Sequence, residues 1–276
     1  MDDLFSASTR ERSFKNAPLA VRMRPNSLDE YVGQQKAVGK GSWLRAAIEH
    51  DVLSSVILYG PAGTGKTTLA HIIANHTKSE FVEVSAVTGT VKDLRRVIDE
   101  AKTRLNTYDR RTILFIDEIH RFSKSQQDAL LHAVENRTVI MIGATTENPY
   151  FEVNSALLSR GRVVELEHLK DEDIAMLIER ALEAPQGLNG KFSADDDTVK
   201  TICTLAAGDA RSALTTLELA SEIAVTRPDT EGTPAPAAGE RYPITVDDVK
   251  IANPRRGFTY DKNGDMHYDI ISAFIK

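Results

Sequence analysis

The stretch GPAGTGKTT, residues 60–68, constrains the fold of this chain more than any other part of its sequence. It matches the phosphate-binding spacing G-x-x-x-x-G-K-[ST], and it lies where that motif requires, between an apolar strand pattern and a helical pattern. Its glycines let backbone N–H groups turn inward around phosphate oxygens, and the positive end of the following helix attracts the same anion. The motif predicts a nucleotide site built from Gly60, Pro61, Ala62, Gly63, Thr64, Gly65, Lys66, Thr67 and Thr68.

Two side chains of this loop have roles that follow from the motif. Lys66 is expected to reach the β- and γ-phosphates of ATP, and the Thr67 hydroxyl is expected to ligate Mg²⁺. A glycine-rich turn that matches by accident is the alternative, and an acidic pair further along the chain argues against it.

That pair is Asp117 and Glu118, which end the apolar run ILFIDE. Ligands of open α/β sheets bind at this end of the strands. Neighbouring strand residues point to opposite faces, so the two carboxylates have different tasks. We assign Asp117 to the magnesium shell and Glu118 to polarising the attacking water, and a merely solvated acidic pair is the alternative. His120 follows, with a nucleotide-sensing role and a packing role both open.

Strand and helix patterns alternate up to residue 168. Strands are expected at 55–60, 81–86, 112–118, 139–146 and 162–167, and helices at 66–77, 91–105 and 125–135. This rhythm predicts an α/β fold with a mostly parallel sheet and helices on both faces. Beyond Leu169 we expect no strands, because the apolar spacing at 171–183, 194–207 and 209–225 is helical. Ser193 is the expected cap of the second of these helices, and the acidic triplet 195–197 its first turn.

These patterns divide the chain into four parts. Residues 1–17 are expected to be a flexible tail, 18–168 the α/β domain, and 169–252 a small all-helical domain. Within the helical domain, residues 227–243 are rich in proline, glycine and small side chains, which predicts a flexible loop. Residues 253–276 are interpreted as the start of a further region that is cut short.

Composition excludes several classes of protein. The net charge is −6, so a strongly basic protein that coats nucleic acid is not indicated. The single cysteine, Cys203, rules out an internal disulfide and is expected in the core. No apolar run approaches the roughly 20 residues needed to cross a bilayer, and no secretory signal is present, so we expect no membrane partner and a cytoplasmic location.

Several segments together resemble the AAA+ ATPases, in their clamp-loader-like branch, and most of all the replication-associated recombination protein A (RarA/MgsA) family. They are RMRP and YVGQ in 22–34, GPAGTGKTT, FIDEIHRF, GATTENP, NSALLSR, GDAR and GDMHYDIISAFIK. The resemblance runs from about residue 18 to residue 276. It implies an AAA+ α/β ATPase domain followed by a helical lid domain, and a C-terminal oligomerisation region that would begin at 253–276.

The resemblance also implies site residues. Tyr31, Val32 and Gly33 would line the adenine pocket, Thr146 would be the polar sensor beside the γ-phosphate, and Arg211 would approach the phosphates from the lid. In rings of this family an arginine after the sensor strand completes the neighbour's site, and Arg160 in ALLSR matches it, with Arg162 as second choice. Gly161 departs from the family pattern, which puts the local backbone geometry in question but not the role of Arg160.

By this resemblance the chain is expected to be a DNA-dependent ATPase that acts in replication-fork maintenance, recombination and DNA repair. Its cofactors would be ATP and Mg²⁺. Its partners would be DNA with single-stranded ends, gaps or forks, single-stranded-DNA-binding protein, the replication machinery and further copies of itself, in a bacterial cytoplasm at the nucleoid. The alternatives are a clamp-loader subunit, a Holliday-junction branch-migration ATPase, or a nucleotide-gated scaffold with little turnover.

Overall fold

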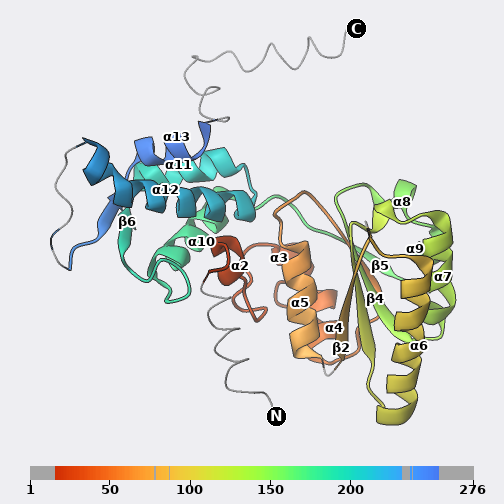
Figure 1. Cartoon of the computed structure of the whole chain (residues 1–276). Helices are drawn as coiled ribbons and strands as arrows, with labels where there is room; N and C mark the ends of the chain where they lie inside the picture. The colour runs from red at the N-terminus through yellow and green to blue at the C-terminus, as the bar shows by residue number, and fades with distance from the viewer. Residues whose placement is uncertain (1–15, 78, 87, 232–236, 238, 255–276) are drawn as a thin grey trace, which may run out of the picture. The chain divides into compact units, whose positions relative to one another are not determined.

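The computed structural model describes residues 16–77, 79–86, 88–231, 237 and 239–254, and these form two compact units (Figure 1). The larger unit consists of Met23–Met176 and Gly208–Ala210. The smaller unit consists of the described residues up to Arg22, of Leu177–Ala207 and of the described residues from Arg211 to 254. Each unit is described by itself.

A five-stranded parallel sheet, in the order β2-β3-β4-β1-β5, forms the centre of the larger unit. The strands are β1 (Val56–Tyr59), β2 (Glu80–Ser85), β3 (Thr112–Asp117), β4 (Val139–Thr145) and β5 (Arg162–Glu165). All five expected strands are confirmed, with ends that shift by at most two residues. Strand β4 is buried along its whole length because it lies in the middle of the sheet and helices cover both faces.

The side chains of β3 alternate between two apolar cores, one on each face of the sheet. Ile113 and Phe115 enter the core formed with α3 (Gln35–Val38), α4 (Trp43–Glu49) and α5 (Lys66–His76). Leu114 and Ile116 enter the core formed with α6 (Val91–Tyr108), α7 (Lys124–Glu135) and α9 (Ser155–Leu158). The shorter elements of this unit are η1 (Ile119–Arg121) and α8 (Pro149–Glu152). The sheet is thus covered on both faces, as the alternating pattern predicted.

The smaller unit is mainly helical. It contains α2 (Leu19–Arg22), most of α10 (Asp171–Glu183), α11 (Asp196–Ala206), α12 (Ala210–Glu231) from its second residue onward, and α13 (Val246–Ala252). Arg22 joins α2 to this unit through a 3.1 Å ion pair with Glu218 and a 2.6 Å hydrogen bond to the carbonyl of Gln186. Cys203 is buried in α11, as expected.

Three expectations for this region need correction. The expectation of no strands beyond Leu169 was wrong: β6 (Phe192–Ala194) pairs in parallel with β7 (Tyr242–Ile244). The expected loop 227–243 is helical up to Glu231 and extended again from Tyr242, since the Arg227 guanidinium bonds to the Pro243 carbonyl at 3.0 Å and to Asp248 at 2.6 Å. Ser193 lies in β6, and Asp195 caps α11 in its place by accepting from the Thr198 N–H at 2.8 Å.

The expected limits of the parts of the chain stay predictions. The tail 1–17 and the region 253–276 lie almost entirely outside the described residues. Among the helices that the structure describes, none is long and apolar enough to cross a membrane.

Candidate nucleotide site

Three predicted groups of site residues follow three neighbouring strands of the sheet. The phosphate loop follows β1, Thr146 follows β4, and Asp117 and Glu118 end β3. Strand β4 lies between β1 and β3, and all three are parallel. The fold therefore brings these residues to one edge of the sheet, the carboxyl edge, where α/β folds bind ligands.

The loop between β1 and α5 has a backbone that only glycine adopts without strain. Gly63 has φ +69° and Gly65 has φ +94°, both in the left-handed region. A Cβ atom on Gly65 would lie 2.5 Å from the Tyr31 hydroxyl oxygen, and one on Gly63 would collide with the Asp209 carboxylate. Both positions therefore require glycine, because of the left-handed backbone and because a Cβ atom would clash.

The Lys66 side chain is buried against its own loop. Its ammonium group donates to the carbonyl oxygens of Gly60 and Pro61, each at 2.7 Å. Lys66, Thr67 and Thr68 form the first turn of α5, whose positive dipole end faces the loop. The arrangement holds a cation, backbone N–H groups and hydroxyls around the place where the motif puts phosphate oxygens.

The segment before α3 packs on the phosphate loop. The Tyr31 hydroxyl lies 3.2 Å from the carbonyl oxygens of Thr64 and Gly65, and burial raises the pKa of this phenol far above its usual value, so it stays a donor. Val32 and Gly33 are half-buried beside it. The structure therefore brings Tyr31 to the nucleotide site, whereas lining of the adenine pocket by Tyr31, Val32 and Gly33 remains a prediction.

Gln34 is a structural residue of this site that the sequence did not single out. Its amide nitrogen donates to the Glu167 carbonyl at 2.7 Å, and its amide oxygen accepts from the Glu167 N–H at 3.0 Å. The same nitrogen lies 3.4 Å from the Thr64 carbonyl. Gln34 thus ties the phosphate loop to the chain that follows β5. It ends the YVGQ segment, of which only Tyr31, Val32 and Gly33 were expected at the site.

Asp117 and Glu118 leave the end of β3 in different directions. Asp117 lies two residues beyond Phe115, so it faces the same side as α5, which carries Thr67. Glu118 has φ +54° and ψ +50°, which turns the chain sharply after the strand. One of its carboxylate oxygens, Oε2, accepts a 3.4 Å hydrogen bond from the Thr146 hydroxyl. The structure thus places Thr146 beside Glu118, whereas its role beside the γ-phosphate remains a prediction.

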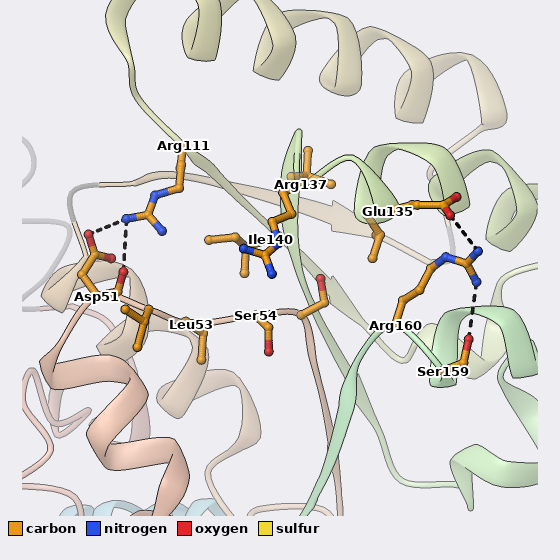
Figure 2. A pocket seen from close by; sticks show the side chains of 13 residues that line it. Asp51, Leu53, Ser54, Arg111, Glu135, Arg137, Ile140, Ser159 and Arg160 are labelled. Carbon is orange, nitrogen blue, oxygen red and sulfur yellow. Dashed lines mark hydrogen bonds and ion pairs between the residues drawn. The ribbon is translucent and has the colours of Figure 1, made fainter.

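Arg160 lies just before β5, which is parallel to β1, so it lies at the amino ends of the strands, opposite the phosphate loop. Figure 2 shows it among the side chains that line a cavity there. It lines a cavity of about 600 Å³ together with residues that precede β1, β3 and β4, such as Asp51, Arg111 and Arg137. Its guanidinium donates to the Ala156 carbonyl at 2.8 Å and pairs with Glu135 at 3.3 Å. Parallel strands separate this amino edge from the carboxyl edge that bears the phosphate loop, so Arg160 does not complete the nucleotide site of its own chain.

The two candidate arginines differ in what holds them. The Arg162 guanidinium lies 4.5 Å over the ring of Trp43, a cation–π contact within the same unit. Arg160 has no aromatic contact among the described residues, and its ion-pair partner Glu135 is exposed. Arg211 is the second residue of α12, is exposed and belongs to the smaller unit, so its contact with the phosphates remains a prediction.

Two family models match this chain, one in its α/β part and one in its C-terminal part. Residues 56–170 match the model described as "ATPase family associated with various cellular activities (AAA)", and residues 188–276 match "AAA C-terminal domain". An AAA domain-containing protein of Mycobacterium tuberculosis is 47% identical over 94% of this chain and 54% of its own length. Replication-associated recombination protein A of Escherichia coli is 46% identical over 94% of this chain and 56% of its own length. The chain belongs to the AAA+ ATPase family of replication-associated recombination protein A.

A solved structure extends the comparison within the AAA+ ATPases. The Thermotoga maritima RuvB Holliday junction branch migration motor has a TM-score of 0.65 and 29% identity, and it covers 84% of this chain and 72% of its own. The chain spans about half the length of the curated relatives it matches. The P-loop α/β fold and the helical C-terminal region expected from the sequence are thereby confirmed.

Proposed function

We propose that this chain is the ATPase part of a DNA-dependent AAA+ enzyme, which hydrolyses ATP to ADP and phosphate in replication-fork maintenance, recombination and DNA repair. The observation that carries the proposal is the position of Glu118. Its carboxylate is held beside Thr146 at the sheet edge that also bears the phosphate loop. A carboxylate in that place can accept a proton from water that attacks the terminal phosphoryl group.

The residues around the loop have complementary tasks in this proposal. Backbone N–H groups of the loop and the Lys66 ammonium hold the β- and γ-phosphates in exchange for the carbonyl contacts that Lys66 makes here. The Thr67 hydroxyl and the Asp117 carboxylate supply oxygen donors of the kind that Mg²⁺ prefers, and their placement toward the same face of the sheet fits a shared ion. Bound Mg²⁺ would neutralise charge on the phosphates.

Thr146 orients Glu118 and is the proposed sensor of the γ-phosphate. Arg211 is the proposed cation from the helical unit. Arg160 is the proposed trans group, because it lies on the sheet edge remote from its own loop and lines an open cavity with further arginines. Of the two arginines, Arg160 is preferred because Arg162 is occupied by Trp43.

The DNA partners follow from the relatives. The name of the curated relatives refers to replication and recombination, and the structural relative is a Holliday junction motor. We propose that gapped or forked DNA stimulates turnover, that several copies assemble, and that single-stranded-DNA-binding protein and the replication machinery are partners. The likeness to the RuvB motor keeps branch migration as a second candidate, and ATP-driven displacement of a four-way junction would distinguish the two.

The test compares wild type with Glu118→Gln, using phosphate release with and without forked DNA and the affinity for a fluorescent ATP analogue. The amide keeps the size of the side chain but cannot accept the proton, so turnover is expected to fall about 10²- to 10⁴-fold while nucleotide affinity is retained. Equal turnover by the two proteins would exclude Glu118 as the water-polarising group. A wild type that binds ATP but releases no phosphate with any DNA would favour the scaffold alternative.

A further inference from the structure

We propose that His120 is a positioning residue, which fixes the Glu118 carboxylate by donating a proton from Nδ1 to Oε2. The inference rests on the proposed function, because it concerns the group that would polarise water. His120 is buried except for about 15% of its side chain. Its Nδ1 atom lies 3.2 Å from Glu118 Oε2 and 2.9 Å from Thr145 Oγ1.

The hydrogen-bond partners decide which form of the imidazole is present. The Thr145 hydroxyl donates to the Glu147 carbonyl at 3.2 Å, and its oxygen accepts from the Glu147 N–H at 3.0 Å. Both atoms that face Nδ1 are then acceptors, namely the Thr145 oxygen and a carboxylate oxygen of Glu118. A bare Nδ1 lone pair would repel them, so Nδ1 carries a hydrogen and shares it between the two.

These contacts give the two oxygens of the Glu118 carboxylate different roles. Oε2 accepts from His120 and also from the Thr146 hydroxyl at 3.4 Å. Two donors on one oxygen restrict rotation of the carboxylate, and they leave the second oxygen, Oε1, to accept from water. Orientation of a reacting group in advance is a major source of catalytic rate, and here His120 would provide it.

The backbone around His120 is built to hold it there. Glu118 adopts a left-handed conformation, which is strained for a residue with a Cβ atom. The next residue, Ile119, is fully buried and packs over Gly143 of β4, where a Cβ atom would lie 2.9 Å from the Ile119 Cδ1 atom. The turn is therefore anchored in the core, so His120 faces the end of β4.

The same contacts connect Glu118 to the phosphate loop. The N–H of Gly60, the first loop residue, donates to the Thr145 carbonyl at 3.2 Å, and the Thr145 side chain meets His120. His120 thus holds Glu118 against the strand end that also carries the loop. A movement of this strand end would carry the carboxylate with it.

Two amide substitutions provide a matched test. In His120→Asn the side-chain nitrogen takes the place of Nδ1, whereas in His120→Gln it takes the place of Nε2. We expect His120→Asn to keep kcat within about threefold of the wild-type value, and His120→Gln to lower kcat about tenfold or more. The second effect should be smaller than the fall in kcat caused by losing the general base itself. The affinity for the fluorescent ATP analogue should stay constant, because neither variant changes the phosphate loop. His120→Phe, which keeps a ring without a donor, should behave as His120→Gln does.

Single-turnover measurements in the Glu118→Gln background separate positioning from structural damage. If His120 acts through the carboxylate, His120→Gln lowers the rate no further when Glu118 is already glutamine. Equal kcat values for the Asn and Gln variants would overturn the inference, and so would an equal fall in both backgrounds. If Glu118→Gln hydrolysed ATP as fast as wild type, the result would instead contradict the proposed function itself.

Discussion

Mixing two inactive variants would show whether ATP hydrolysis is shared between copies of this chain. Arg160→Ala keeps a complete nucleotide loop but offers no guanidinium at the opposite edge of the sheet. Glu118→Gln keeps Arg160 but cannot polarise water. If the arginine acts in trans, an interface between the two variants can be active. The Arg160→Ala copy supplies the nucleotide site with Glu118, and the neighbouring Glu118→Gln copy supplies Arg160.

The expected magnitudes separate catalysis from stability. Arg160 pairs with Glu135 at 3.3 Å, and both side chains are partly exposed, at 32% and 52%. A surface pair of this kind contributes up to about 1 kcal/mol, so the variant should fold as wild type does. An arginine that acts in trans contributes about 10³–10⁵ in rate, or roughly 4–7 kcal/mol of transition-state stabilisation. A large fall in rate without a fall in Tm is therefore the expected signature.

The assay measures phosphate release by protein of full natural length, after subunits have exchanged. In a random 1:1 mixture, about one quarter of the interfaces combine an intact Glu118 with an intact Arg160, so roughly a quarter of the wild-type rate should return. Arg162→Ala is the control, because its contact with Trp43 concerns local stability and its rate should stay near that of wild type. A mixture no more active than its components, despite proven exchange, would refute hydrolysis in trans.

Three further predictions concern stability and are checked by urea or thermal unfolding. Leu114→Ala removes a fully buried side chain from β3 and should cost about 2–5 kcal/mol; a loss below 1 kcal/mol would contradict the close packing described for this strand. Arg227→Ala leaves the buried Asp248 carboxylate without its cation and should cost about 3 kcal/mol, whereas Arg241→Ala, at an exposed pair, should cost less than about 1 kcal/mol; equal effects would contradict the assignment. Hydrogen bonds from Thr90 lower the pKa of Asp93 below its usual 3.8, so its stabilising effect is complete above that pH and is lost as the pH falls through the lower folded value. The Tm difference between wild type and Asp93→Ala should accordingly shrink in strong acid, and a difference that grows there would show the sign to be wrong.

The fold of the larger unit could be predicted from its sequence because local and tertiary signals agree there. Each strand is short and contains apolar, β-branched residues, and the helices between strands each have an apolar face that packs on the sheet. The smaller unit was harder. Proline and glycine in 227–243 indicated a loop, but a single arginine, Arg227, binds Thr245, Pro243 and Asp248 from the end of a helix. A contact over that sequence distance outweighs local propensity, and no periodicity reveals it.

The nucleotide site divides in the same way. The phosphate loop is contiguous, so its spacing is visible in the sequence, and the Asp–Glu pair follows from a strand that ends in carboxylates. The role of His120 was left open and that of Gln34 was missed, although they lie in the segments FIDEIHRF and YVGQ. Their partners lie 25 and 133 residues away, and such pairings cannot be read from the sequence. The left-handed backbone at Glu118 could not be predicted from the sequence either, since glutamate has no preference for this conformation.

Arg160 shows how topology can supply what a motif does not. The strands before and after it are parallel, so the connection that carries it must return from the carboxyl edge to the amino edge before β5 begins. The phosphate loop follows β1 at the carboxyl edge, and Arg162 pairs with Val56 at the start of that strand. An arginine just before β5 is thus separated from the loop of its own chain by the length of a strand, about 13 Å for four residues. If it stabilises a phosphoryl group, that group belongs to a nucleotide on another copy.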